Sequence, residues 1–331
     1  MYPLAEPMSS PRIIEEVFDA VHTGRYFARL VGQPAPHRGR RPPELLYHAT
    51  LNAVEPRFTV VTPMFNAAES VDDYLEATAA HATLPFDWIV IDDASDDGTG
   101  DRAKALLARN RHPAVARATI VRNPVPVFET ACDNLGFTLA DTEVIVEIQG
   151  DIQIQEAAYD ALLIRAFATM PKPSSLSGRC GHSFLELRNR FARAMFGRGQ
   201  DECVGLCGTL IERPESIDPL RGRLYRCDTV PRGPWVVLKS DLVRYGYLDE
   251  RHFFLGNDDH DYHRRLLEAE GRRPLYVPMA IRSPLRLGAT RRRRSGVNEE
   301  VFQALKAEKK GSPEFRRFLG QARSSVPQQV L

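Results

Sequence analysis

The sequence predicts an α/β fold with a mostly parallel central sheet flanked by helices. Phe58–Thr62 and Trp88–Ile91 are short β-rich runs, and each is followed by polar residues that end a strand. Between them, Glu69–Ala80 carries apolar residues at close to helical spacing. A strand, a helix and a second strand in this order are typical of a right-handed crossover within one parallel sheet.

The same alternation continues along the chain. The next expected elements are a helix over Asp101–Ala108, a strand over Ala118–Val121, a helix over Glu129–Ala140 and a strand over Glu143–Ile148. Sheets of this kind bind ligands beyond the carboxyl ends of their parallel strands. Phe65, Asp93 and Asp151 each follow a predicted strand. We therefore expect these three residues at one binding edge.

A second polar cluster lies far downstream, within Arg251–Leu266. Asp258, Asp259 and Asp261 fall within four positions, between an aromatic, glycine-containing segment and a helical continuation. Carboxylates so close together repel one another and raise each other's pKa, which favours a role with a metal, a cationic group or a proton. The alternative is an ordinary helix N-terminus, where aspartates cap free N–H groups.

The motifs together resemble a family 2 glycosyltransferase of the GT-A fold, an inverting enzyme, over roughly Phe58 to Pro278. In chain order they are Val60–Asn66, Ile91–Thr99, Asn134 with Gly136, Gln149-Gly150-Asp151 and Asp258-Asp259, with Pro234–Lys239 and Tyr245–Asp249 before the last pair. The first two are similar to the opening strand and the nucleotide-binding loop. The third is similar to the Asn-x-Gly helix start, the fourth to the DxD metal motif and the fifth to the Glu-Asp pair of the family.

The resemblance implies transfer of a sugar from a nucleoside-diphosphate sugar, with UDP favoured, to a hydroxyl acceptor that is a saccharide, lipid-linked or otherwise. It implies Asp259 as general base, with Asp258 as its orienting neighbour. The implied nucleotide-sugar site comprises Pro63, Phe65, Asn66, Asp93, Ser95, Asn134, Gln149, Gly150 and Asp151. The implied acceptor contacts are Trp235, His182 and Asp261. For Phe65 an ordinary place in the core is the alternative.

Asp151 is the implied ligand of Mg²⁺ or Mn²⁺, which suit a departing diphosphate. The chain departs from the family pattern at Gln149, which stands where the first DxD aspartate is expected. Arg282 stands where a further histidine ligand is expected, and a guanidinium can itself contact phosphate oxygens. A sugar-phosphate nucleotidyltransferase and a non-catalytic nucleotide-sugar-binding module are the alternative functions.

The chain divides into three expected parts. Residues 1–56 form an extension with a helix over Ile13–Leu30 and a Pro/Arg-rich linker over Gln33–Pro43. Residues 57–285 form the glycosyltransferase domain, with a nucleotide-sugar half (57–155) and an acceptor half (156–285). Residues 286–331 form a basic tail with a helix.

The charge balance and the hydropathy of the sequence bear on its partners and on its cellular compartment. The chain has 44 basic and 43 acidic residues, which gives no overall argument for nucleic-acid binding. Without a long apolar run or signal core, we expect a cytoplasmic enzyme of polysaccharide or glycoconjugate biosynthesis. Arg291–Arg294 is expected to be a solvated segment, a donor-diphosphate contact or a peripheral contact at the inner face of a membrane.

The five cysteines are expected to be reduced thiols. They are odd in number and scattered, at positions 132, 180, 203, 207 and 227. Cys203–Cys207 has no second His/Cys pair at zinc spacing, so we assign it to a buried strand.

Overall fold

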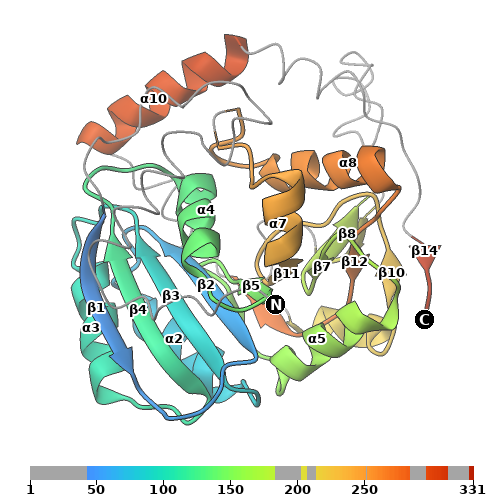
Figure 1. Cartoon of the computed structure of the whole chain (residues 1–331), viewed down its shortest axis with the longest axis horizontal. Helices are drawn as coiled ribbons and strands as arrows, with labels where there is room; N and C mark the ends of the chain where they lie inside the picture. The colour runs from blue at the N-terminus through green and yellow to red at the C-terminus, as the bar shows by residue number, and fades with distance from the viewer. Residues whose placement is uncertain (1–42, 183–202, 207–213, 251, 284–295, 312–327) are drawn as a thin grey trace.

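The computed structural model describes residues 43–182, 203–206, 214–250, 252–283, 296–311 and 328–331. Its main feature is a ten-stranded sheet with the order β1-β4-β3-β2-β5-β11-β7-β12-β10-β14. Four of the described strands form its parallel centre (Figure 1). They are β2 (Phe58–Met64), β3 (Phe86–Asp92), β4 (Val115–Arg122) and β5 (Val144–Glu147).

Further strands extend this parallel centre on both sides, and β1 (Glu44–Thr50) is the one beside β4. On the acceptor side they are β11 (Trp235–Leu238), β7 (Leu176–Ser177), β12 (Leu275–Tyr276), β10 (Tyr225–Arg226) and β14 (Gln328–Gln329). Among the described strands, β1, β10 and β11 run opposite to the other seven in this sheet. The predicted α/β class with a mostly parallel central sheet is confirmed.

Helices cover the two faces of the parallel centre because successive strand residues point to opposite sides. On one face, Val60 and Trp88 pack with α2 (Val71–Ala80) and α3 (Thr99–Arg109). On the other face, Val61 and Ile89 pack with α4 (Glu129–Leu139). These helices and strands lie within a few residues of the bounds that the sequence predicted, and Figure 1 shows α4 in front of the sheet.

The acceptor half contains shorter elements. Its helices are α5 (Tyr159–Thr169), the 3₁₀ helix η1 (Pro214–Leu220), α7 (Lys239–Tyr245) and α8 (Asp258–Glu270). Two small sheets pair β6 (Gln153–Ile154) with β13 (Ile281–Arg282), and β8 (Cys180–His182) with β9 (Cys203–Gly205). The strand predicted over Cys203–Cys207 is thus present in its first three residues.

Two edges of the large sheet come from segments outside the expected catalytic domain. The strand β1 (Glu44–Thr50) lies within the predicted extension, yet it pairs with β4. At the other edge β14 pairs with β10, and α10 (Gly296–Gly311) provides the expected tail helix. Ile13–Leu30, most of Gln33–Pro43, and Arg291–Arg294 lie outside the described residues.

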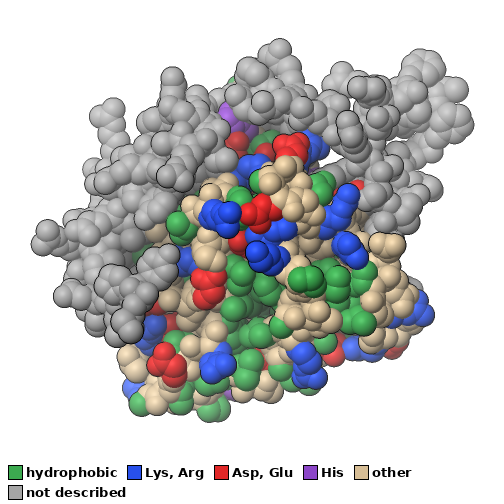
Figure 2. All heavy atoms as spheres, turned by 45° about the vertical axis from the view of Figure 1, so that its right-hand side comes forward, with side chains coloured by type: hydrophobic (Ala, Val, Ile, Leu, Met, Phe, Trp, Pro, Cys, Tyr) green, Lys and Arg blue, Asp and Glu red, His purple; other side chains and the backbone are tan. Residues whose placement is uncertain are grey.

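None of the helices in the described ranges combines the length and the apolar character needed to cross a membrane. On the face drawn in Figure 2, basic and acidic side chains are intermingled between hydrophobic ones. This mixture matches the near-zero net charge of the sequence.

Candidate active site

The loops after β2 and β3 are joined by two hydrogen bonds. The backbone N–H of Asn66 donates to Ser95 Oγ at 3.0 Å, and Asn66 Oδ1 accepts from the N–H of Asp96 at 3.1 Å. Asn66 has a positive φ of 47°, a conformation that asparagine adopts more readily than most residues. Phe65 is 9% exposed, and Pro63 lies within β2. Both predicted loops therefore meet at the carboxyl edge of the sheet.

Asp93 is buried directly after β3, and its carboxylate accepts hydrogen bonds from within the protein. The N–H groups of Val127 and Phe128 donate to it at 2.8 Å each, and Asn123 Nδ2 donates at 3.0 Å. Burial nevertheless raises the pKa of Asp93, while these hydrogen bonds oppose that shift. The carboxylate holds the loop that leads into α4, a role that the sequence did not indicate.

Asn134 is also fully buried and ties α4 to the segment before α8. Its Nδ2 donates to the carbonyl of Leu248 at 2.9 Å, and its Oδ1 accepts from the N–H of Leu248 at 3.0 Å. A Cβ at Gly136 would lie 2.3 Å from Val61 Cγ1, so only glycine permits this approach of α4 to β2. The Asn-x-Gly motif thus positions the helix against both halves of the domain.

The Gln149-Gly150-Asp151 segment follows β5 and is half-buried. The N–H of Gly150 donates to the carbonyl of Pro63 at 3.3 Å, which holds this turn against the end of β2. Gln149 Nε2 donates to Glu129 Oε1. Arg282 is exposed and lies opposite Gln153 in the β6–β13 pair, two residues beyond Asp151. The structure therefore brings the predicted diphosphate residues together at one edge.

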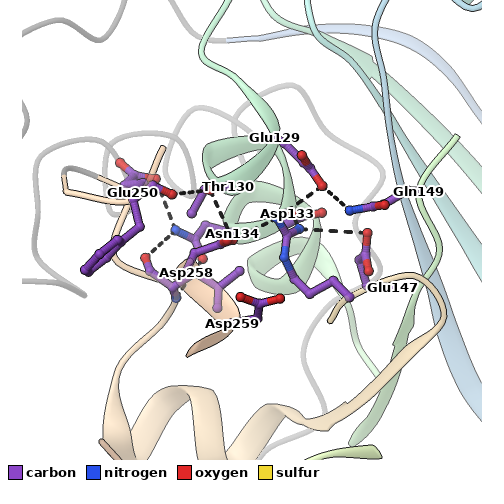
Figure 3. A network of polar contacts seen from close by, with 12 residues as sticks. Glu129, Thr130, Asp133, Asn134, Glu147, Gln149, Glu250, Asp258 and Asp259 are labelled. Atoms are coloured by element: carbon purple, nitrogen blue, oxygen red, sulfur yellow. Dashed lines mark hydrogen bonds and ion pairs between the residues drawn. The ribbon is translucent and has the colours of Figure 1, made fainter. Parts of the chain in front are cut away.

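Arg232 is the centre of the polar network, although the sequence did not single it out. Its side chain is 3% exposed, and its guanidinium forms ion pairs with four carboxylates, whose residues are labelled in Figure 3. The partners are Glu129 (3.1 Å), Glu147 (3.8 Å), Asp258 (2.8 Å) and Asp133. Because these partners come from α4, β5 and α8, no local sequence pattern could have revealed the cluster.

The cluster carries more acidic than basic groups. Burial raises the pKa of Glu147 well above its ordinary value, and the neighbouring Glu129 and Asp258 raise it further. Both carboxylate oxygens of Glu147 are buried without a hydrogen-bond partner. The carboxylates of Glu129, Asp133 and Glu147 lie close enough to hold a metal ion, but Arg232 forms ion pairs with all three. A guanidinium therefore already occupies the cationic position of this cluster.

Asp258 and Asp259 begin α8 and lie in different surroundings. Asp258 has a side chain only 1% exposed, beside Arg232 and with Thr130 Oγ1 at 3.1 Å. Burial raises the pKa of Asp258 to about 7; Arg232 opposes this shift, and the charge of Asp259 adds to it. The first turn of α8 thus contains a carboxyl group that titrates near neutral pH.

Asp259 keeps more contact with solvent than Asp258. Its side chain is 13% exposed, and it accepts a hydrogen bond of 2.7 Å from the N–H of His260. Burial alone would raise the pKa of Asp259, but attraction to His260 and Arg232 outweighs that effect and lowers it. In Figure 3 its carboxylate lies beside the network, and no dashed line joins it to the other residues drawn.

Two of the predicted acceptor residues, Trp235 and His182, differ in their burial. Trp235 is fully buried at the start of β11, with its ring edge-on to Tyr262. His182 lies in β8, half-buried, and its ring centroid is 6.4 Å from that of His260. His182 therefore lies near His260, the residue that follows the Asp258–Asp259 pair in α8.

Asp261 forms an ion pair with a residue of its own helix. It contacts Arg265 at 2.9 Å, and Arg265 also donates to the carbonyls of Tyr245, Gly246 and Tyr247. Burial raises the pKa of Asp261, and Arg265 opposes that shift. The side chain thus helps to fix the turn before the Asp258–Asp259 pair.

Residues 59–172 match the family model "Glycosyl transferase family 2". The match covers 114 of the 331 residues. The matched segment runs from β2 to α5 and includes the strand-end loops and α4. The glycosyltransferase assignment predicted from the sequence motifs is therefore confirmed.

No curated protein matches this sequence. Among solved structures, the chain is similar to Staphylococcus aureus TarS 1-349, with 13% identity, 79% of this chain and 68% of that chain covered, and a TM-score of 0.46. It is also similar to the mannosyltransferase PcManGT from Pyrobaculum calidifontis, solved with GDP-Man and Mn²⁺. That match has 16% identity, covers 93% of this chain and 84% of that one, and has a TM-score of 0.49.

Proposed function

We propose that this glycosyltransferase moves a sugar from a nucleoside-diphosphate sugar to an acceptor hydroxyl, with inversion at the anomeric carbon and Asp259 as general base. The observation that carries the proposal is the contrast at the start of α8. The pKa of Asp258 is raised to about 7 while that of Asp259 is lowered. Neighbouring carboxyl groups with separated pKa values are typical of sites that divide proton-transfer roles.

The proposed reaction is a single displacement. Asp259 accepts the proton of the acceptor hydroxyl, and the acceptor oxygen forms a bond to the anomeric carbon. The bond from that carbon to the diphosphate breaks, and the nucleoside diphosphate leaves with the electron pair. Asp259 is the better candidate because it is partly exposed, whereas Asp258 is buried against Arg232.

The donor nucleotide is proposed to bind at the edge formed by the loops after β2, β3 and β5. A uridine diphosphate sugar is our first choice, and guanosine and thymidine donors are the alternatives. Phe65 offers a ring beside the base, and Asp93 acts through the loop that it holds before α4. The diphosphate lies by Asp151 in this proposal, with Arg282 close in the β6–β13 pair.

The donor set near Asp151 fits a divalent metal held weakly by the protein. Asp151 offers one half-buried carboxylate, and the side-chain amide of Gln149 is engaged with Glu129. Mg²⁺ is commonly held by one or two carboxylates together with substrate phosphates. Bound Mg²⁺ or Mn²⁺ would supply positive charge against the diphosphate leaving group. Asp151 is the residue that would hold it.

The acceptor is proposed to be a saccharide, a lipid-linked sugar or another hydroxyl compound of glycoconjugate synthesis. His260 lies 4.0 Å from Asp259, and the ring of His182 lies 6.4 Å from that of His260; these two histidines are the candidate contacts on this side. If the acceptor is lipid-linked, Arg291–Arg294 would add attraction to an anionic membrane of about 1 kcal/mol per charge. That contact would keep a peripheral enzyme at the inner face of the membrane.

A panel of UDP, GDP and TDP sugars tests this function through release of the nucleoside diphosphate. We expect one nucleotide class to be turned over, chelator to abolish the activity, and Mn²⁺ or Mg²⁺ to restore it. Little metal should bind before nucleotide is added, and Asp151→Asn should weaken metal-dependent nucleotide binding. Full turnover in excess chelator would contradict the metal assignment, and release of pyrophosphate from a nucleoside triphosphate would favour a nucleotidyltransferase.

A further inference from the structure

A continuous line of polar contacts joins the donor loop to the acidic pair of α8 (Figure 3). Gln149 Nε2 donates to Glu129 Oε1, and Arg232 Nη2 lies 3.1 Å from the same oxygen. The same guanidinium nitrogen lies 2.8 Å from Asp258 Oδ2. The donor loop and the start of α8 are therefore separated by only two intervening side chains, Glu129 and Arg232.

We propose that Arg232 is a positioning residue of the transfer reaction, which fixes the donor loop and the Asp258–Asp259 pair in one arrangement and supplies the positive charge that faces Asp258. The proposal rests on the function proposed above. Arg232 is too deeply buried to touch either substrate, since its side chain is 3% exposed. It acts through Glu129 toward the donor and through Asp258 toward the base.

The backbone next to Arg232 makes this arrangement rigid. Gly233 has a positive φ of 71°, and a Cβ at this position would lie 3.1 Å from Gln149 Cγ. On the other side, Thr130 Oγ1 lies 2.7 Å from the carbonyl oxygen of Phe253 and 3.1 Å from Asp258 Oδ2. The guanidinium is thus held between a tight turn and the loop that precedes α8. Moving it would disturb both ends of the site.

The charged groups around the Asp258–Asp259 pair determine in which direction a substitution shifts the pKa of each aspartate. Asp258 faces Arg232, which lowers its pKa, and Asp259 and Glu129, which raise it. Glu147 is a further buried acid, and the charge of Asp258 raises its pKa. Asp259 faces His260, Arg232 and His263, and all three favour its ionised form. Removing the charge of Arg232 and removing the charge of Glu129 should therefore have opposite effects on Asp258.

Three variants distinguish the effect of the position of the Arg232 side chain from the effect of its charge. The measurement is the pH dependence of kcat/KM with the nucleotide sugar that the donor panel identifies. Arg232→Gln should move the acidic limb upward by about 1 pH unit, because a neighbouring cation shifts a carboxyl pKa by at least this much. Glu129→Gln should move it downward. Arg232→Lys keeps the charge, so the limb should stay near its wild-type position while the rate falls. Arg117→Lys is the matched control, because Arg117 pairs with Asp87 and Asp141 far along the sheet edge.

A measurement that needs no turnover distinguishes failure of this proposal from failure of the proposed function. The carboxyl-carbon NMR titration of Asp258 should shift downward in Glu129→Gln and stay unchanged in Arg117→Lys, whether or not transfer is found. This titration can also be measured if the Arg232→Gln variant does not fold. An unchanged titration of Asp258 in Glu129→Gln, or equal pH limbs in all variants, would overturn the proposal and leave Arg232 with a purely structural role.

Discussion

The carboxylate of Asp93 and the carboxylates around Arg232 are removed from water to a similar degree, but the protein compensates them differently. Asp93 is 4% exposed and receives three hydrogen bonds from uncharged donors between residues 123 and 128. The cluster around Arg232 instead relies on one guanidinium shared among four acids. The first region is a local loop closure, and the second is a long-range charge balance.

This difference indicates which of the two regions has the perturbed carboxyl groups that are typical of a functional site. Uncharged N–H donors satisfy the acceptor oxygens of Asp93 within one short loop, which is typical of a structural anchor. The second region keeps excess negative charge in a buried place, where each added carboxylate raises the pKa of the others. Such perturbed groups concentrate at functional sites.

Arg232→Met should give the largest loss of folding stability. Removing the cation leaves Asp133, Glu147 and Asp258 buried without a counter-ion, which costs about 3–5 kcal/mol in comparable buried pairs. The free energy of unfolding from urea titrations measures this loss. Arg117→Met is the control, because that side chain is 26% exposed and its ion pairs should be worth about 1 kcal/mol or less. Equal losses in the two variants would remove the charge-balance interpretation.

Asp93→Ala should cost less, about 2 kcal/mol, because it leaves the N–H groups of Val127 and Phe128 without their acceptor. Asp93→Asn retains one acceptor oxygen and should recover part of the loss. Because the loop leads into α4, nucleotide affinity should also fall in the alanine variant. An affinity that does not change while stability falls would limit Asp93 to a structural role.

Taken per pH unit, the pH dependence of stability should show the smallest effect, at most about 1.4 kcal/mol for one group. The pKa of Asp258 rises from an ordinary 3.8 to about 7 on folding, so between these values the folded state binds its proton more tightly than the unfolded state. Its contribution to stability is therefore present at acidic pH and lost as pH rises toward 7. Asp258→Asn should flatten this part of the curve of unfolding free energy against pH. A curve that keeps the wild-type slope would contradict the assigned shift.

The parallel centre of the sheet could be predicted from the sequence because its information is local. Each strand carries an apolar run followed by a polar loop, as in Trp88–Ile91 before Asp92 and Asp93, and helical spacing fills the gaps. The acceptor half could not be predicted in this way, since β7, β10 and β12 are two residues long. Strands this short are defined by pairing with distant partners rather than by their own pattern.

The same distinction applies to the candidate site. Its loops were placed correctly at the strand ends, but the internal roles of Asp93 and Asn134 depend on partners that follow 30 or more residues later. Arg232 is the extreme case, because Asp133 lies 99 residues away in the chain. A single arginine before a Gly-Pro turn carries no pattern that indicates such a partner. Only the assembled fold reveals it.

The transfer rates of Asp259→Asn and Asp258→Asn, measured together with nucleotide affinity, test the central claim most directly. Asparagine keeps the shape and hydrogen bonding of aspartate but cannot take the acceptor proton, so Asp259→Asn should lower turnover by about 10²- to 10⁴-fold. Nucleotide affinity should be unchanged in that variant, because the donor edge lies at other strand ends. Asp258→Asn should lower turnover less. A larger loss at Asp258 would exchange the two roles, and near-normal transfer in both variants would contradict the catalytic assignment.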